Sequence, residues 1–231
     1  MRRFTDRATE PVEVLLNQLL SATESPEVYR DTMYKVGLQI GHDIASSYGD
    51  SSTEVYIACT VEDADFLAKG IIDALESKQV FQAVRLACFW NERSKIDGFI
   101  SIAPILKRYS EPFSSSNQLL VVVKSIISGA CVVKTNLTNL IKDQNPSKIL
   151  ITAPVMYKGA NLRLEKEFTP EITKLFSYLT YAIDDEKSND GNITPGIGGD
   201  VYQLLGFGDQ QTKNRYIPEI VKRRRINFAN P

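Results

Sequence analysis

Cysteine, histidine, net charge and long apolar runs are all scarce in this chain of 231 residues, and each scarcity excludes a class of protein. The three cysteines, Cys59, Cys88 and Cys131, lie far apart. An odd number without metal-type spacing argues against a disulfide framework and against a metal site of the zinc type. The 27 basic and 28 acidic residues nearly cancel, so no overall field favours nucleic acid or a membrane surface.

The start of the chain and its single histidine argue against secretion and against a catalytic histidine. The polar first residues lead into no apolar signal segment, and no apolar run reaches the roughly 18 residues of a spanning helix. We therefore expect a reduced, cytoplasmic setting. The only histidine, His42, falls in an expected helix without a serine or cysteine pattern beside it, which favours a structural or solvated role over that of a catalytic base.

What is present indicates one domain with short extensions. The hydrophobic share of 43% is enough for a substantial core. We expect an N-terminal extension with a short helix over residues 1–24, a main domain over 25–208 and a basic tail over 209–231. The run Lys222-Arg223-Arg224-Arg225 is more typical of a solvated or partner-contacting end than of a nucleic-acid reader, although it leaves nucleic acid open.

Strands and helices alternate along the main domain. Ser25 and Pro26 form a helix start, and the apolar positions that follow predict an amphipathic helix over 26–47. Strands are predicted at 54–59, 83–90, 119–123, 148–153 and 178–183, with helices at 62–77 and 130–142 and an ambiguous helical segment at 171–179. Strand, helix and strand in short succession predict an α/β fold with a central, mainly parallel sheet flanked by helices.

The stretch from Leu119 to Cys131 is the centre of this pattern. Five consecutive apolar residues predict a strand buried on both faces, and a turn of small residues then opens a helix. In an open α/β sheet such a junction binds ligands, because free amides at the helix start face an anion. The small residues Ser128, Gly129, Ala130 and Cys131 are the candidate anion-binding residues of this turn.

A second candidate region is the loop over 184–200, which is rich in Asp, Asn, Gly and Pro. Long loops without periodicity are usually functional or disordered, and the segment Pro195-Gly196-Ile197-Gly198-Gly199 favours a defined backbone path lining a site.

Both regions carry a resemblance to a known family. The turn Val123-Lys124-Ser125-Ile126-Ile127-Ser128-Gly129-Ala130-Cys131 resembles the phosphoribosyl-diphosphate loop of type I phosphoribosyltransferases, in particular the uracil enzymes, which write roughly V-D-P-M-L-A-T-G-G. The segments Thr180-Tyr181-Ala182-Ile183-Asp184, 190–200 and Leu205-Gly206 resemble their base-binding segment. The resemblance runs from about residue 20 to 206. It implies phosphate- or ribose-site candidates Lys124, Ser125, Ser128, Gly129, Ala130, Cys131 and Arg93. It also implies base-site candidates Ile193, Gly198, Gly199 and Asp200, with Mg²⁺ only if phosphoribosyl diphosphate is bound.

The same resemblance implies a β-hairpin arm over about 94–118 that protrudes and makes a homodimer. Five apolar residues of this segment would be exposed in a monomer, which supports the dimer: Phe99, Ile100, Ile102, Ile105 and Leu106. The alternative is an arm that folds back on its own subunit.

The positions that do the family's chemistry differ here. Lys124 replaces the acid that binds the ribose hydroxyls, and Glu62-Asp63-Ala64 replaces an Arg-Ala-Gly that holds the diphosphate. The second family arginine falls on Asn91, although Arg93 lies two residues further on. Asp200 is displaced by one position. Each such loss removes about 2–4 kcal/mol of transition-state stabilisation, so ordinary uracil salvage is not expected.

The sequence therefore predicts a divergent phosphoribosyltransferase-like protein that binds a nucleotide-like ligand or a protein partner, with no catalytic residue assigned. By analogy at the family level, it would be an accessory component of a bacterial multi-gene defence-type system. One alternative is an active transferase that converts uracil or a related base and phosphoribosyl diphosphate to a nucleotide. Another is an enzyme that acts on a phosphoribosylated or nucleotide substrate by changed chemistry, with Ser128, Asp184, Asp185 and Asp200 as participants. A sheet domain without any ligand remains a further interpretation.

Overall fold

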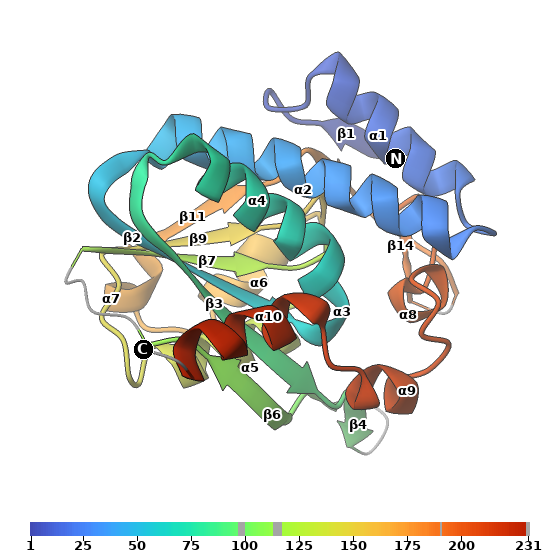
Figure 1. Ribbon diagram of the computed structural model, residues 1–231. Helices are drawn as coiled ribbons and strands as arrows, with labels where there is room; N and C mark the ends of the chain where they lie inside the picture. Colours follow the sequence, from blue (N-terminus) through green and yellow to red (C-terminus); the bar gives the residue numbers. More distant parts are fainter. Residues whose placement is uncertain (97–99, 113–116, 190, 230–231) are drawn as a thin grey trace.

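The structure is a computed structural model that describes the chain except residues 97–99, 113–116, 190 and 230–231 (Figure 1). Its centre is a six-stranded sheet of order β11-β9-β7-β2-β3-β6. The strands are β2 (Asp50–Thr60), β3 (Phe81–Asn91), β6 (Ile105–Ser110), β7 (Gln118–Val123), β9 (Lys148–Thr152) and β11 (Phe176–Leu179). Neighbouring strands are parallel except for β6, which pairs antiparallel with β3. The predicted mainly parallel sheet is confirmed.

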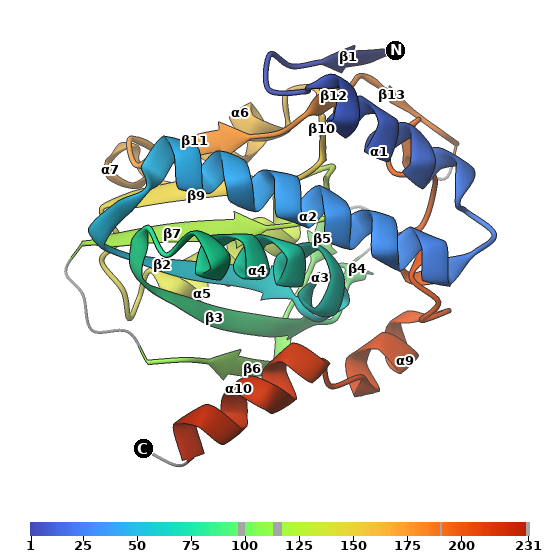
Figure 2. The ribbon, with the colours of Figure 1, turned by 45° about the horizontal axis from the view of Figure 1, so that its top comes forward.

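Helices cover both faces of this sheet (Figures 1 and 2). On one face lie α2 (Pro26–Tyr48), α3 (Val61–Asp63), the π-helix η1 (Ala64–Ala68) and α4 (Lys69–Lys78); on the other lie α5 (Cys131–Leu140) and α6 (Ala160–Glu165). The predicted helix start is confirmed, since Ser25 Oγ accepts the backbone N–H of Val28. Glycines let α2 approach η1 and α4 closely, because a side chain at Gly37 would collide with the backbone of Leu67 in η1 and one at Gly70 with the backbone of Tyr34 in α2.

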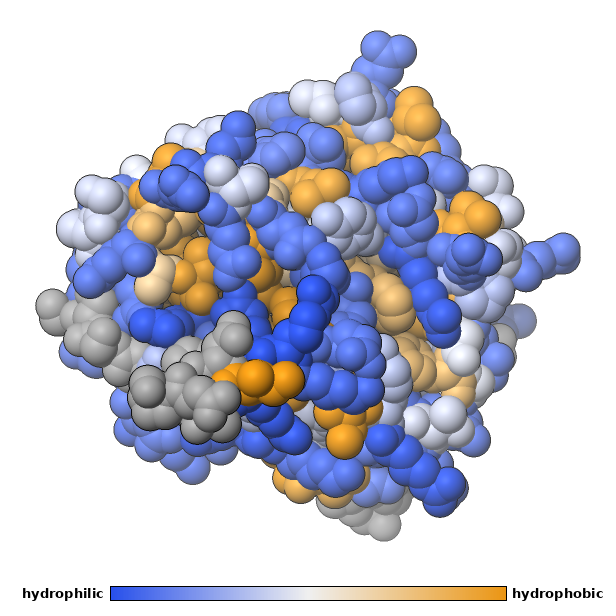
Figure 3. Space-filling view, in the orientation of Figure 1, coloured by the Kyte–Doolittle hydropathy of each residue, from blue (hydrophilic) through white to orange (hydrophobic). Residues whose placement is uncertain are grey.

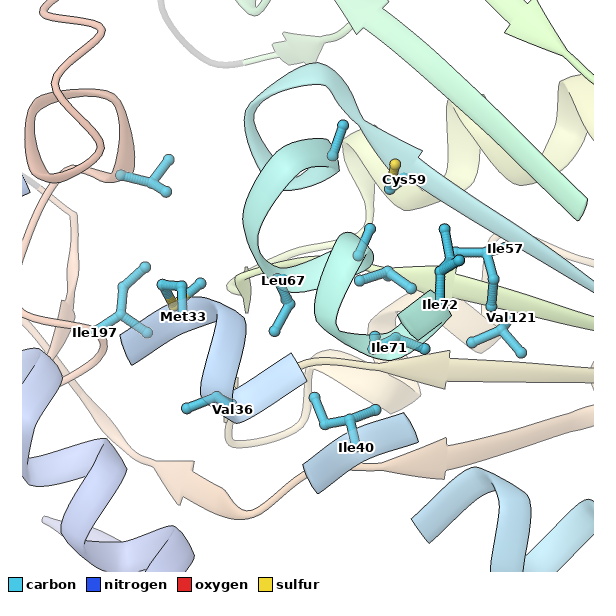
Figure 4. Packing of buried hydrophobic residues seen from close by; sticks show 14 of the residues in the cluster. Met33, Val36, Ile40, Ile57, Cys59, Leu67, Ile71, Ile72, Val121 and Ile197 are labelled. Atoms are coloured by element: carbon cyan, nitrogen blue, oxygen red, sulfur yellow. The ribbon is translucent and has the colours of Figure 1, made fainter. Parts of the chain in front are cut away.

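The two faces of each central strand supply two separate cores. On β2, Val55, Ile57 and Cys59 face the α2 and α4 side, whereas Tyr56 and Ala58 face the α5 side. The first core is seen in Figure 4, where Ile40, Leu67, Ile71 and Ile72 from the helices meet Ile57 and Val121 from the strands. Burial of alternate residues on both faces explains the continuous apolar run of β7.

A second, smaller sheet stands beside the first, with order β1-β12-β10-β8. It contains β1 (Arg2–Phe4), β8 (Ile126–Ile127), β10 (Val155–Tyr157) and β12 (Ala182–Asp184), and the helix α1 (Glu10–Ser21) packs nearby on α2. The strand predicted at 178–183 is wrong as a single element, because the chain leaves the main sheet after β11 and enters the small sheet at β12. Of the ambiguous helical segment at 171–179, only the first turn is helical, as α7 (Pro170–Thr173). The chain then enters the main sheet as β11 at Phe176.

The segment expected to be an arm is divided between two structures. A hairpin of β4 (Ser94–Ile96) and β5 (Ile100–Ile102) stands apart from the main sheet, whereas β6 forms an edge of that sheet. Ile102 and Ile105 are half-buried and Leu106 is 49% exposed. Phe99 lies outside the described residues, and dimer formation through this segment stays a prediction.

The basic tail packs against the body instead of extending from it. After α8 (Val201–Leu204) come α9 (Gln210–Arg215) and α10 (Glu219–Ala229). The carboxylate of Asp65 accepts the backbone N–H groups of Glu219 and Ile220 at 2.8 and 2.9 Å and so caps α10. Arg224 pairs with the buried carboxylate of Glu111 at 3.1 Å, while the neighbouring Arg223 is exposed.

Neither the described helices nor the face drawn in Figure 3 indicates contact with a membrane. Among the described helices, none is both long enough and apolar enough to cross a bilayer. Figure 3 shows a mainly hydrophilic face on which hydrophobic residues come to the surface in scattered patches.

Candidate functional site

The carboxyl ends of β2 and β7 lie where the connections of the main sheet reverse direction. The chain after β2 crosses to β3 through α4 on one face, and the chain after β7 crosses to β9 through α5 on the opposite face. Open α/β sheets bind ligands at such a switch point. The residues after β2 and β7 therefore form the candidate site, as the sequence pattern predicts.

Lys124, the first residue after β7, is buried and faces the acids that follow β2. Its Nζ donates to Asp63 Oδ2 at 2.6 Å, to Glu62 Oε1 at 3.0 Å and to Thr60 Oγ1 at 2.7 Å. The next backbone N–H, that of Ser125, donates to the other Asp63 oxygen at 3.1 Å. The lysine and the two acids, which the sequence presents as separate departures from the family pattern, are thus a single ion-pair cluster.

The cluster shifts the ionisation of its own members. Burial alone would lower the pKa of Lys124, but the carboxylates of Asp63 and Glu62 outweigh burial and raise that pKa above its ordinary value. Burial alone would raise the pKa of Glu62, but the cations Lys124 and Lys213 lower it to about 2. The charge of Lys124 is offset by the two carboxylates that it bonds to, so Lys124 contributes little free positive charge to the crevice.

A pH dependence of stability follows from Glu62. A carboxyl group with a pKa lowered from 4.5 to about 2 by folding contributes stability that is present above pH 4.5 and is lost as the pH falls through 2. For a fully buried group the contribution is about 3 kcal/mol. We expect the difference in unfolding free energy between wild type and Glu62→Gln to shrink towards zero between pH 5 and pH 2, as measured by urea titration. A difference that stays constant over this range would contradict the ion-pair assignment.

A pocket of about 530 Å³ opens beside this cluster. It is lined by the turn and helix start at 126–133, by Lys124, by Ser94 and Ile102 of the β4–β5 hairpin, and by Arg93 and Lys187. The volume is in the range of small-molecule sites. Apolar side chains of Ile102, Ile127 and the start of α5 share the lining with these polar groups, so the pocket suits a ligand with both an anionic and an apolar part.

The turn before α5 offers hydrogen-bond donors to this pocket. Within the described part of the chain, the backbone N–H groups of Ser128, Gly129 and Ala130 donate to no protein acceptor, and no side chain caps α5. The hydroxyl of Ser125, which lines a small adjoining space and not this pocket, is buried and has no partner among the described residues. Free amides at a helix start, next to an unpartnered hydroxyl, are suited to the oxygens of a phosphate group.

Two further cations line the pocket without being neutralised. Arg93 is exposed, and Lys187 lies over the ring of Tyr157 at 4.5 Å. In the described residues neither side chain has an ion-pair partner, whereas Lys124 has two. The positive charge available to a ligand therefore comes from Arg93 and Lys187.

The base-site candidates meet the phosphate candidates in an adjoining space of about 60 Å³. Ile193, Gly199 and Asp200 line it together with Ser125, Ser128 and Arg93. Gly198 lies elsewhere, since a side chain there would meet Leu19 and Thr23 of the N-terminal extension. The hairpin of β13 (Glu186–Lys187) and β14 (Ile193–Thr194) brings this segment over the turn. The two candidate regions are therefore neighbours in space.

The acids proposed as participants in an enzyme have other partners. Asp184 is buried, pairs with Arg2 at 2.8 Å and accepts the backbone N–H of Gly196 at 2.8 Å, so it fixes the loop. Asp185 is exposed and lines neither of these two pockets. Asp200 lines the smaller space but caps α8 through the backbone N–H of Tyr202 at 2.8 Å.

Burial raises the pKa of the Cys131 thiol, which disfavours the thiolate at neutral pH.

The arrangement does not fit a magnesium ion. Glu62 and Asp63 turn oxygens towards Lys124, and the remaining Glu62 oxygen lies 3.9 Å from Lys213 Nζ. No cluster of three or more acid, histidine or cysteine side chains in the described ranges is placed to hold a metal ion. A hard divalent cation needs several oxygen ligands. Here the ammonium groups of Lys124 and Lys213 already take the place beside the carboxylate oxygens that such a cation would occupy.

Sequence reasoning missed three residues at or beside the site. Lys187 comes from the loop and faces the pocket, while Gln210 and Lys213 come from the tail and approach the end of β3. No local pattern singles out these residues, because each reaches the site only through the packing of a segment that is distant along the chain.

Comparisons with known proteins show the fold but no family. No protein-family model matches the chain, and no curated protein matches it in sequence. The AQ2163 protein from Aquifex aeolicus is similar in structure, with a TM-score of 0.66 at 15% identity over 86% of this chain and 95% of that one. This likeness establishes a shared α/β fold.

Two weaker likenesses have TM-scores too low to bear on the assignment. The hypoxanthine-guanine phosphoribosyltransferase of L. donovani has a TM-score of 0.36 at 14% identity, over 72% of this chain and 77% of that one. A hypothetical protein from Neisseria gonorrhoeae, with bound ppGpp, has a TM-score of 0.39 at 12% identity, over 77% of this chain and 93% of that one.

Proposed function

We propose that this protein is a divergent phosphoribosyltransferase-like protein that binds a phosphorylated, nucleotide-sized ligand and does not transfer phosphoribosyl groups. The observation that carries the proposal is the pocket at the switch point, where unpartnered amides lie in a lining that also contains two cations, Arg93 and Lys187. The Ser125 hydroxyl belongs to the adjoining space, which shares Arg93 and Ser128 with this pocket. The phosphate of the ligand binds at the Ser128–Ala130 turn. The apolar wall at Ile102 and Ile127 takes the rest of the ligand.

The absence of transfer activity is argued from the Lys124 cluster. Phosphoribosyl transfer requires acids for the ribose hydroxyls and magnesium on the diphosphate. At the ribose position this chain has a lysine already bonded to Glu62 and Asp63, and those acids are not free to take a metal ion. A ligand with a single phosphate therefore suits the site better than phosphoribosyl diphosphate.

Calorimetry tests this proposal directly. Wild-type protein is titrated with UMP, uracil, phosphoribosyl diphosphate and inorganic phosphate, each with magnesium and with a chelator. We expect saturable heat with UMP, competition by inorganic phosphate, little response to uracil and no dependence on magnesium. Formation of UMP from uracil and phosphoribosyl diphosphate would establish the enzyme instead, and the absence of heat with every anion would reject the binding function.

A further inference from the structure

The C-terminal segment forms hydrogen bonds with three residues at and just after the end of β3, and one of these residues is Arg93 of the pocket. We propose that the segment 209–216 is a positioning element of the phosphate pocket, in which Gln210 fixes the backbone of Arg93 so that its guanidinium faces the bound anion. The inference rests on the proposed function, because Arg93 matters only if an anion binds.

Gln210 contacts both backbone groups of Arg93 with one side chain. The backbone N–H of Arg93 donates to Gln210 Oε1 at 2.6 Å, and Gln210 Nε2 donates to the Arg93 carbonyl oxygen at 3.1 Å. Arg93 itself follows the end of β3 in irregular backbone. The paired hydrogen bonds therefore supply the order that neither helix nor strand gives to this residue.

Two further hydrogen bonds join the tail to the end of β3. Lys213 Nζ donates to the carbonyl oxygen of Asn91 at 2.8 Å, and Trp90 Nε1 donates to the carbonyl oxygen of Tyr216 at 2.8 Å. Lys213 is 1% exposed, so this part of the contact is sealed from solvent. Residues 90, 91 and 93 are thus each bonded to the same short stretch of the tail.

Asn91 also connects this stretch to the phosphate turn. Its side-chain amide exchanges hydrogen bonds with Asn136 of α5 at 2.9 and 3.1 Å. The helix whose first amides face the pocket and the strand end that carries Arg93 are therefore fixed relative to one another. A cation held in this way binds with less loss of conformational freedom than one on a loose loop.

The tail has its own anchors, so it positions Arg93 and not the reverse. Asp209 caps α9 by accepting the backbone N–H of Thr212 at 2.7 Å. Further along, Asp65 caps α10, and Arg224 pairs with Glu111. These contacts involve no residue of the 91–94 loop.

The test is a double-mutant cycle on UMP binding in the full chain. Gln210→Met keeps the length of the side chain and removes both hydrogen bonds, and we expect affinity to fall about five- to tenfold. In the Arg93→Ala background the same substitution should cause no further loss. Gln211→Ala, at the exposed next position, is the control and should bind as wild type does.

Each outcome decides a different question. Wild-type binding with an unchanged Gln210→Met, or an equal loss from Gln210→Met with and without Arg93, would overturn the positioning role alone. Failure of wild type to bind any anion would overturn the proposed function. Should Gln210→Met unfold, Gln210→Glu keeps an acceptor for the Arg93 N–H and removes the donor to its carbonyl; an affinity equal to that of wild type would also overturn the inference.

Discussion

Replacement of Lys124 by methionine should destabilise the protein by about 3–5 kcal/mol, the usual cost of leaving a buried charge without its partner. Lys124 is 3% exposed and is the nearest cation to both Glu62 and Asp63, at 3.0 and 2.6 Å. Without it, two carboxylates would remain in the crevice, and Lys213, at 3.9 Å from Glu62, and the more distant Arg93 would offset them less well. Urea unfolding followed by circular dichroism measures the loss.

Two further variants make this result specific to the ion pairs. Lys35→Met removes an exposed lysine paired with Asp31 at 2.7 Å and should change stability by less than about 0.5 kcal/mol. The triple variant Lys124→Met, Glu62→Gln, Asp63→Asn removes the three charges of the cluster together but leaves the buried cation Lys213 beside it, so it should recover part of the loss. A Lys124→Met protein as stable as wild type, with weakened UMP binding, would show that the lysine serves the ligand and not the acids.

Charge reversal at Arg93 should have the largest effect on binding. Arg93→Glu removes a charge-assisted hydrogen bond worth about 1.5–3 kcal/mol and adds repulsion of the phosphate, so we expect UMP affinity to fall about 100-fold or more. Because Arg93 is exposed and has no ion-pair partner among the described residues, stability should change little. Calorimetry gives the affinity, and thermal unfolding monitors the fold.

The matched control is Arg223→Glu, the same charge reversal at an exposed position on α10 that does not line the pocket. It changes the net charge equally, so any long-range electrostatic effect on binding appears in both variants. Equal losses for Arg93→Glu and Arg223→Glu would mean that the anion is attracted by the whole surface and not held at the 125–131 turn.

The structure changes the meaning of the departures from the family pattern. Along the sequence, Lys124 and Glu62-Asp63 are two separate substitutions, each of which removes a substrate-binding group of the family. In space they compensate each other, because parallel pairing of β2 and β7 places their carboxyl ends side by side. Opposite charges just beyond adjacent buried strands are a signal that the sequence contains, but it becomes useful only once those strands are known to be neighbours.

The residues that could be predicted are those whose structure is encoded locally. Ser25 and Pro26 start α2, the alternation of strand and helix patterns gives a mainly parallel sheet, and the apolar run before Lys124 is a strand that ends beside the pocket. The split of the predicted 178–183 strand was missed because the same apolar pattern serves two sheets.

By itself, the sequence determined the elements, the direction of most strands and the location of the turn between β7 and α5, because burial periodicity and capping act within one element and its immediate neighbours. Only the tertiary structure decided which charges meet. Lys124 bonds to acids 61 and 62 residues earlier, and Gln210 holds a residue 117 positions away. Such contacts depend on strand order and on where the tail packs, and neither is written in the spacing of the residues that take part.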